Sequence, residues 1–199
     1  MITVIIGIVV VIVIVCAIAG IYNNMVTKRN RIDNAWQNID TQLQRRNDLI
    51  PNLVETVKGY AAHESETLES VTRARAGLTD AYNAARDIPD TAPADQQALD
   101  AFNNSQSQLG RAFSVYVNAV REAYPDLKAD GQFQDLQTQL EGTENRIATE
   151  RGRYTEAVRD YNIRVRKFPA SIVASLSGFA VKPQFQADAA AATAPKVEF

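Results

Sequence analysis

The most continuous hydrophobic pattern in this chain is an unbroken apolar run close to its start. Residues 4–21 read VIIGIVVVIVIVCAIAGI, and no charged side chain occurs between Met1 and Thr27. A run of about 18 or more apolar residues is long enough to cross the hydrocarbon core of a bilayer as a helix. The pattern therefore predicts a transmembrane anchor over residues 1–22.

A cleaved signal peptide is the alternative interpretation of this run. Residues 17–19, Ala-Ile-Ala, resemble the small-residue cleavage site of such peptides. Residues 1–3 carry no basic side chain, however, and the run is longer than the hydrophobic part of a typical signal peptide. We therefore expect the anchor to be retained.

Beyond the anchor, apolar positions recur every three or four residues, which is the periodicity of an amphipathic helix. Four stretches show this spacing: residues 32–43, 53–82, 99–124 and 133–168. No stretch alternates with a period of two, so the sequence predicts no β-sheet. Each apolar stripe needs a partner, because burying one large apolar side chain is worth about 1.5–3 kcal/mol.

Prolines and polar turns separate the four stretches. Pro51 is expected to end the first helix, because proline disfavours helical geometry in the preceding residue and suits the first turn of a new helix. Residues 87–93 and 125–131 have the composition of loops, and Pro169 ends the fourth stretch. Short connections make consecutive helices antiparallel neighbours. The prediction is an all-α fold, in which the transmembrane helix continues into an antiparallel up-and-down four-helix bundle over residues 23–169.

Two further segments follow the predicted bundle. Residues 170–185 are expected to form a short segment that lies near the membrane or packs on the bundle. Residues 186–199 are rich in alanine with little to bury, which predicts a flexible tail. The apolar residues of the first segment fit one side of a short helix: Ile172, Val173, Leu176 and Phe179.

Composition leaves little room for catalytic chemistry. The 199 residues carry a net charge of −2, which gives no general attraction to nucleic acid, and one cysteine, Cys16, excludes an internal disulfide. His63-Glu64 begins like a zinc-protease motif, but the chain has no second histidine, and zinc needs three or four ligands. Glu141 and Glu144 are expected on a solvated helix face. We predict a non-enzymatic protein without catalytic, cofactor-binding or metal-binding residues and without a nucleic-acid partner.

Basic residues occur both directly after the anchor and at the end of the fourth predicted helix. In an up-and-down bundle the fourth helix ends where the first leaves the membrane, so its cations join those that follow the anchor. Lysine and arginine favour the cytoplasmic side and anionic headgroups, which predicts a cytoplasmic bundle on the inner membrane. The alternative is an ordinary solvated helix end, where cations suit the helix dipole. The predicted membrane-proximal cluster comprises Lys28, Arg29, Arg31, Arg159, Arg164, Arg166 and Lys167.

A second polar group surrounds the turn expected at Pro51. Asparagine and aspartate there are explained by turn chemistry, because their side chains satisfy free backbone groups at helix ends. Two adjacent arginines exceed what a turn requires, and a membrane-distal contact surface for a partner is the alternative. The residues of this distal surface are Arg45, Arg46, Asn47 and Asp48, with Asp126 and Lys128 from the loop expected at the same end.

A series of local motifs stands at residues 29–30, 35–40, 42–54, 57–60, 63–64, 124–128, 140–147, 153–154, 161–162, 168–169 and 178–179. In their order and spacing over residues 22–185, these motifs resemble the LemA family. Thr155 stands where the family usually has asparagine, which alters no expected function. The resemblance implies a single-pass membrane protein with an antiparallel four-helix domain and implies no catalytic activity. The family includes a relative implicated in forming bacterial magnetosome membranes, which points toward membrane organisation.

Two functional hypotheses follow. The first is a membrane-anchored scaffold that contacts the lipid bilayer and forms a homo-oligomer. Cys16 and Gly20 form a small-xxx-small pair, a spacing that lets transmembrane helices approach one another. The second is an adaptor subunit of another membrane complex, such as a membrane protease or an envelope machine, that binds through the distal surface.

Overall fold

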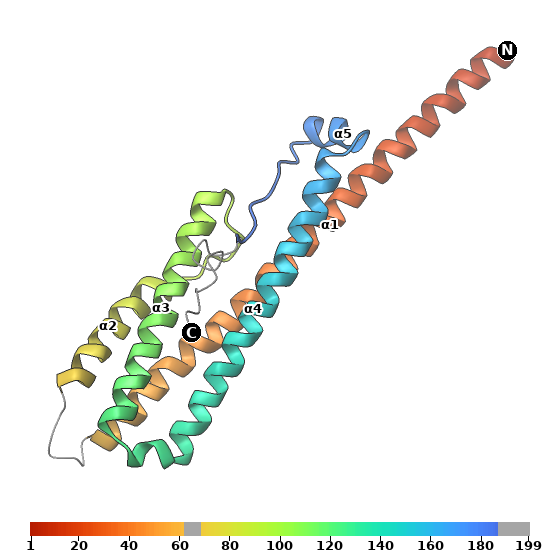
Figure 1. Cartoon of the computed structure of the whole chain (residues 1–199). Helices are drawn as coiled ribbons and strands as arrows, with labels where there is room; N and C mark the ends of the chain where they lie inside the picture. Colours follow the sequence, from red (N-terminus) through yellow and green to blue (C-terminus); the bar gives the residue numbers. More distant parts are fainter. Residues whose placement is uncertain (62–68, 187–199) are drawn as a thin grey trace, which may run out of the picture.

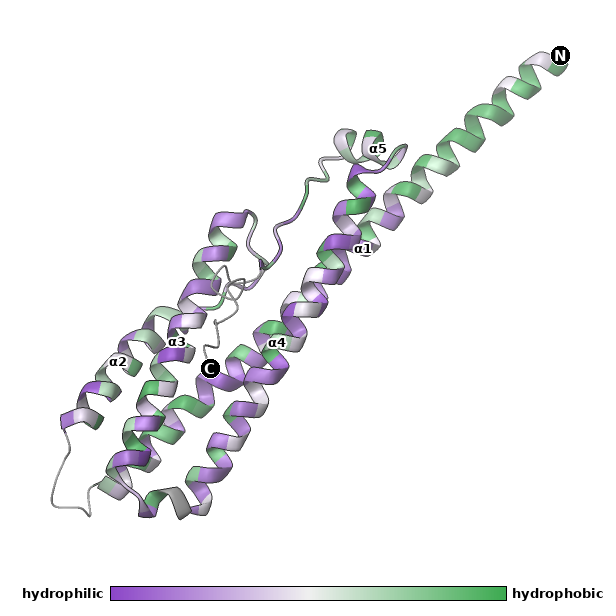
Figure 2. Cartoon of the chain, viewed as in Figure 1, coloured by the Kyte–Doolittle hydropathy of each residue, from purple (hydrophilic) through white to green (hydrophobic). Residues whose placement is uncertain are grey.

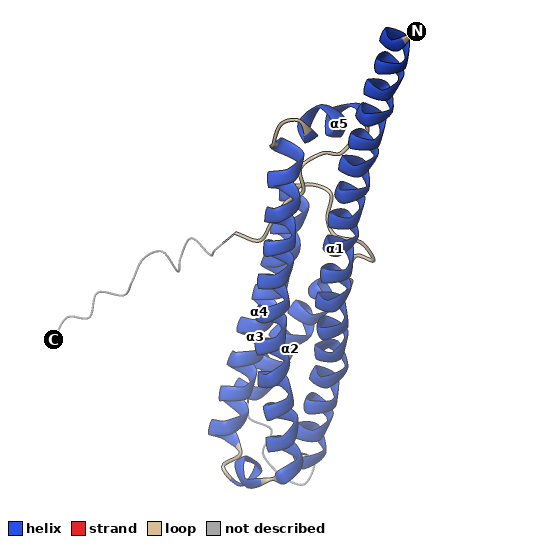
Figure 3. Cartoon of the chain, turned by 90° about the vertical axis from the view of Figure 1, so that its right-hand side faces the viewer, coloured by secondary structure: helices blue, strands red, loops and turns tan. Residues whose placement is uncertain are grey.

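The computed structural model describes residues 1–61 and 69–186, with the exception of the side chains of Lys128 and Ala129. Throughout this described part the regular structure is helical and no strand occurs, as the sequence predicted (Figure 3). The elements are α1 (Ile2–Ala61), α2 (Glu69–Ala85), α3 (Gln96–Ala123), the short 3₁₀ helix η1 (Asp126–Ala129), α4 (Gly131–Arg166) and α5 (Ala170–Leu176).

The helix α1 contains both the apolar segment and the first amphipathic stretch without a break. The apolar segment projects beyond the other helices, and the hydrophobic end stands alone in Figure 2. It is the one described helix long and apolar enough to cross a membrane. No structural boundary marks residue 22, so the apolar segment and the first amphipathic stretch share one continuous helix.

The prediction that Pro51 ends the first helix is wrong. The helix continues through Pro51 to Ala61, and the next described helix begins at Glu69. Proline lacks an amide hydrogen, so the carbonyl of Asn47, four residues earlier, loses its usual helical partner. The hydroxyl of Tyr82 on α2 donates to this carbonyl at 3.2 Å. A contact from another helix thus replaces the hydrogen bond that proline removes.

Replacing Tyr82 with phenylalanine tests this explanation. Tyr82→Phe leaves the Asn47 carbonyl without its donor. We expect the free energy of unfolding to fall by about 1 kcal/mol, the usual net value of one hydrogen bond. Urea unfolding of the full chain in mild detergent measures the change. Tyr22→Phe, at an exposed position of α1, is the matched control, and an equal loss in both variants would contradict the explanation.

The two long helices α1 and α4 pack against each other in opposite directions. Contacts pair Asn38 with Glu150 and Arg46 with Glu144, so residue numbers rise on α1 as they fall on α4. α2 packs against α3 in the same assembly, and Figure 1 shows this second pair beside the first (Figure 1). α4 therefore ends beside the part of α1 that follows the apolar segment.

Two aspartates begin the helices of the second half. Asp95 accepts a hydrogen bond from the Ala98 amide at 2.8 Å, and Asp130 accepts one from the Phe133 amide at 2.9 Å. These side chains satisfy amide groups that have no partner inside a first helical turn. The predicted loops at 87–93 and 125–131 therefore end at defined caps.

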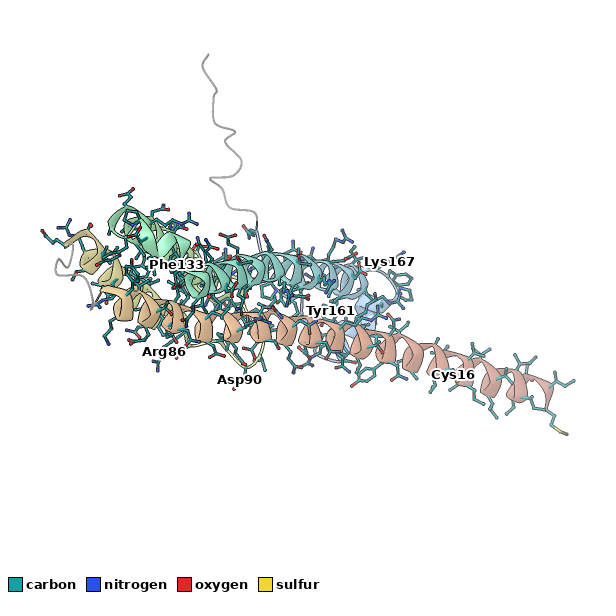
Figure 4. All side chains as sticks on the ribbon, turned by 90° about the horizontal axis from the view of Figure 1, so that it is seen from below. Cys16, Arg86, Asp90, Phe133, Tyr161 and Lys167 are labelled. Atoms are coloured by element: carbon teal, nitrogen blue, oxygen red, sulfur yellow. The ribbon has the colours of Figure 1, made fainter. Side chains whose placement is uncertain are left out.

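The interior consists of two hydrophobic clusters, one toward the anchor and one at the far end. The anchor-side core is centred on Trp36, whose ring lies 5.4 Å from that of Phe102 and 5.7 Å from that of Tyr154. The far core includes Tyr116, Tyr124 and Phe133. Figure 4 shows Tyr161 on the anchor side and Phe133 at the opposite end (Figure 4).

The segment after α5 returns along α4 and completes the anchor-side core. Asn162 donates to the Lys182 carbonyl and accepts from the Lys182 amide, both at 2.8 Å. Tyr154 and Tyr161 donate to the carbonyls of Pro183 and Ala180. Residues 180–185 are therefore fixed to the bundle by side chains that satisfy their backbone groups. The flexible tail was predicted over residues 186–199, and all of it from residue 187 on lies outside the described residues.

Candidate functional site

Three polar side chains separate the two hydrophobic cores, and we call them the polar layer: Arg46, Gln106 and Thr143. Each occupies a position on the apolar stripe of its own helix, so helix geometry points it inward. On α1 the buried positions run Ile32, Trp36, Ile39, Leu43, Arg46, Ile50, Leu53 and Val57. The layer thus replaces one level of apolar packing in α1, α3 and α4.

Arg46 is the central residue of the polar layer. Its side chain is only 3% exposed, and its Nη1 lies 3.1 Å from Oε1 of Glu144, which is half exposed. Its Nη2 donates to the side-chain oxygen of Gln106. The Arg46 Nε has no hydrogen-bond partner among the described residues. Burying a cation that has an unsatisfied donor is costly. The polar layer therefore contributes less stability than apolar side chains of the same volume would.

The polar layer also determines where α2 ends. Gln106 donates to the Ala85 carbonyl at 2.8 Å, and Asn47 donates to the Arg86 carbonyl at 3.2 Å. The Ala85 carbonyl belongs to the last residue of α2 and the Arg86 carbonyl to the residue after it, at a helix end where intrahelical donors run out. Side chains from α1 and α3 therefore cap α2 at the level of Arg46.

A second guanidinium lies close to this layer. Burial lowers the pKa of Arg151 on α4, and the positive charge of Arg46 lowers this pKa further. Its guanidinium lies 5.2 Å from the centre of the Phe185 ring, which stabilises a cation through the electron-rich face. Arg46 and Arg151 thus concentrate positive charge near the middle of the molecule.

An open groove of about 660 Å³ leads from the surface to Arg46 between α3 and α4. Phe113 and Val117 supply apolar surface, whereas Arg121 and Glu141 bring charge to it. Ligand sites combine apolar walls with a few convergent polar groups. The groove between α3 and α4 combines both kinds of group.

The predicted distal surface does not form as expected. Arg45 and Asp48 are exposed and Asn47 is half buried, but Arg46 lies inside the bundle. All four are in the middle of α1 rather than at a turn, because the helix does not stop at Pro51. Asp126 lies in η1, beside Tyr124, which contacts Tyr60 near the far end of α1. The Lys128 side chain lies outside the described residues.

Residues 45–48 and η1 are therefore about 20 Å apart along the helix axis, at 1.5 Å per residue. They do not combine into one surface. The burial of Arg46 was predictable from the sequence, because Arg46 continues the three-and-four spacing of the first apolar stripe beyond Leu43. The expected break at Pro51 ended that stripe too early.

The residues predicted as a membrane-proximal cluster lie at the anchor-side end of the molecule. Met25 and Ile32 share a core with Val158 and Val165, which brings the end of α4 beside the start of the amphipathic part of α1. Figure 4 shows Lys167 at this end, near where the apolar segment with Cys16 departs. The seven residues are Lys28, Arg29, Arg31, Arg159, Arg164, Arg166 and Lys167.

Two details describe the charges within this cluster. Burial raises the pKa of the Tyr161 phenol on α4, and the positive charge of Arg29 on α1 opposes the rise. Arg159 lies 3.7 Å from Glu156 and 3.8 Å from Asp160, so neighbouring carboxylates offset its charge. The contact of the membrane-proximal cluster with lipid remains a prediction.

Exchanging Arg46 for an uncharged residue tests the energetics of the polar layer. Arg46→Ala leaves Gln106 without its donor and opens a cavity, so we expect the free energy of unfolding to fall by about 1–3 kcal/mol. Arg46→Met restores the volume and removes the buried charge, and its loss should be smaller or absent. Arg45→Ala, at the exposed neighbour, should stay within about 0.5 kcal/mol of the parent. Equal losses for Arg45→Ala and Arg46→Ala would refute the burial of Arg46.

Alkaline pH should weaken both cores. Burial raises the pKa of Tyr116 and of Tyr154 from 10.0 to about 12. The folded state therefore keeps protons that the unfolded chain releases, so stability present below about pH 10 is lost as pH rises toward 12. Urea midpoints measured across this range should fall. Tyr154→Phe should reduce the slope, and midpoints independent of pH would contradict the prediction.

Among the described residues, no group of three histidine, cysteine, aspartate or glutamate side chains is arranged to hold a metal ion. His63 and Glu64, which began the rejected zinc motif, lie outside the described residues. Glu141 and Glu144 both line the α3–α4 groove, and Glu144 pairs with Arg46.

Comparison with known proteins points to one family. The sequence model of the LemA family matches residues 35–199. The magnetosome protein MamQ 2 of Paramagnetospirillum magneticum is 28% identical over 179 residues, covering 83% of this chain and 64% of the relative. The magnetosome protein MamQ of Magnetospirillum gryphiswaldense is 25% identical over 79% of this chain and 62% of its own length.

A protein named LemA from Metamycoplasma hominis is 24% identical over 78% of this chain and 64% of its own length. The chain thus spans a little under two thirds of each of these relatives.

Proposed function

The chain belongs to the LemA family of membrane-associated helical proteins, and on that premise we propose that it is a non-enzymatic, membrane-anchored scaffold that assembles laterally with copies of itself. The observation that carries this proposal is the apolar segment of α1. Its large side chains from Ile2 to Ile18 are exposed, and none of the most apolar window is buried inside the described molecule. So much apolar surface requires a lipid or protein environment.

Lipid fits the length of this segment. Ile2 to Ile21 rises roughly 30 Å as a helix, which equals the thickness of a bilayer's hydrocarbon core. We further propose that the helices outside form one up-and-down four-helix bundle. We propose that this bundle faces the cytoplasm at the inner membrane, which its cations support because Lys and Arg next to a span favour that side.

Self-assembly is supported by small residues in the anchor. A side chain added at Gly20 would meet nothing within 4 Å, so this position is open in the single chain. With Cys16 it forms a small-xxx-small pair, and such pairs let two helix backbones approach closely. The relatives named magnetosome proteins support the membrane association of the chain, on which this assembly depends.

Native mass spectrometry of the full chain in mild detergent tests the proposal. We expect a defined oligomer that Gly20→Leu weakens, because the added side chain separates the anchors without affecting the monomer. Gly7→Leu is the matched control: the site is equally open but lies on a different face of the same helix. A strictly monomeric parent, or equal effects of both substitutions, would refute lateral assembly through this face.

An adaptor role is the second candidate, and the α3–α4 groove favours it. The unpaired Nε of buried Arg46 at its floor is a donor that an apolar helix with an acceptor group of another membrane protein would satisfy. The role predicts that a different protein co-purifies in a fixed ratio. Asn118→Trp would fill the groove and abolish this association.

Asn104→Trp is the control, since Asn104 is also exposed on α3 but does not line the groove. An association that survives Asn118→Trp would contradict the groove as the binding site.

A further inference from the structure

The short helix α5 lies directly beside the point where α1 leaves its apolar segment. Ala170, Val173 and Ala174 are buried in the same core as Met25 of α1. After α5, the Phe179 ring lies 5.5 Å from the ring of Tyr22. Figures 1 and 3 both show α5 crossing the end of α4 next to α1. The inner face of α5 is therefore fixed at the level of residues 22–25.

The opposite face of this region exposes large apolar side chains. Phe168, Ile172 and Leu176 are 75%, 55% and 84% exposed. They are spaced four residues apart, and α5 turns Ala170, Val173 and Ala174 inward. The expected single-sided arrangement of Ile172, Val173 and Leu176 is therefore wrong: α5 has two apolar faces, and only the inner one is covered by the described molecule.

Along the axis of α1, this exposed face lies at the level expected for the membrane surface. If Ile2–Ile21 fills the hydrocarbon core, Tyr22 and Met25 lie at the headgroups, and α5 lies beside them. A single interfacial helix buries its apolar side roughly 5–10 Å into the headgroup and acyl boundary. Phe168, Ile172 and Leu176 are thus in position to enter lipid without any rearrangement of the bundle.

The charged residues nearby also favour lipid as the partner of this face. Arg164, Arg166 and Lys167 directly precede the exposed face, and Lys28 and Arg29 stand on α1 nearby. Cations that flank an apolar interfacial surface bind anionic headgroups while the apolar residues enter the acyl region.

We propose that α5 is a second membrane contact, an interfacial helix whose Phe168, Ile172 and Leu176 insert into the bilayer that α1 spans while the flanking cations bind anionic headgroups. The inference rests on the anchoring part of the proposed function and is independent of lateral assembly. With two points of contact, the bundle is held at a fixed angle to the membrane instead of swinging on one helix.

Fluorescence quenching by brominated lipids tests this contact in the full chain. Cys16→Ser provides a cysteine-free background, and an environment-sensitive dye is attached at Leu176→Cys. Vesicles contain zwitterionic and anionic lipids with bromine on the acyl chains. We expect a blue-shifted emission and a strong loss of intensity on brominated lipid, approaching the loss of the same dye at Ile12→Cys within the anchor.

Val115→Cys is the matched control, because Val115 is an apolar residue of α3 that is 60% exposed. Its neighbour Tyr116 belongs to the far core, so the dye there should keep a water-like emission and remain unquenched. Circular dichroism of each labelled variant verifies that the helices are intact.

The outcomes separate the two proposals. Quenching at Ile12→Cys without quenching at Leu176→Cys overturns the α5 contact and leaves the anchor in place. Absence of quenching at both positions overturns the anchor as well. A dye at Leu176→Cys that is shielded from aqueous iodide but not quenched by lipid means that protein covers this face, which also refutes the proposal.

Discussion

Replacing Val10 and Ile14 with arginine is expected to release the chain from the membrane. Both residues lie in the apolar segment and are exposed along α1. Each arginine at the centre of a membrane-spanning helix costs about 2.5–3.5 kcal/mol on insertion scales. The pair therefore removes roughly 5–7 kcal/mol of insertion free energy, which shifts the equilibrium by several orders of magnitude. Extraction of isolated membranes with alkaline carbonate measures the result.

The control uses the same spacing on the same helix. Asn30 and Asn34 are exposed on α1 beyond the apolar segment, and arginine at both should leave the chain in the membrane pellet. Added cations there approach the headgroups and do not enter the acyl region. If the Val10 and Ile14 double variant also stays in the pellet, the apolar segment is not the anchor.

Trp36→Ala is expected to produce the largest loss of stability in the bundle. Trp36 is almost fully buried, packs on rings from α3 and α4, and donates its indole N–H to the Pro89 carbonyl at 2.9 Å. It thereby connects α1, α3, α4 and the loop after α2. Tryptophan-to-alanine changes in a core typically cost about 3–5 kcal/mol. The free energy of unfolding should fall by that amount.

Urea unfolding followed by circular dichroism at the helical band measures this effect without relying on the lost fluorophore. Trp36→Phe should retain part of the stability, because it keeps an aromatic ring but loses the hydrogen bond to Pro89. Gln37→Ala, at the exposed neighbour, should change stability by less than about 0.5 kcal/mol. A loss below about 1 kcal/mol for Trp36→Ala would mean that this site is not a core position.

The helical class followed from the spacing of apolar residues, because stripes such as Ile32, Trp36, Ile39 and Leu43 are continuous in the sequence. The loop at 125–131 was also recognisable from its proline, glycine and aspartates. The boundary at Pro51 was not, because the compensating Tyr82 hydroxyl comes from a helix far along the chain. Local propensity gives the cost of placing proline inside a helix. The contact from Tyr82, which offsets part of this cost, is a tertiary contact that local propensity does not include.

The polar layer was missed for a related reason. Arg46 appeared as one of two adjacent surface arginines next to an expected turn, although its position continues the buried stripe. The partners Gln106 and Ala85 lie on other helices, and the sequence alone does not bring them together. The return of residues 180–185 along α4 depends on side-chain-to-backbone hydrogen bonds, which have no periodic signature.

We propose that α1 both anchors the molecule in lipid and packs there against a second copy. Single cysteines placed in turn at residues 12–18, in a Cys16→Ser background where needed, should be cross-linked in native membranes with a short bifunctional reagent. We expect covalent dimers at positions three or four residues apart, including Cys16, and weak cross-linking at the positions between them. Uniformly absent dimers, or equal cross-linking at every position, would contradict a specific contact between anchors.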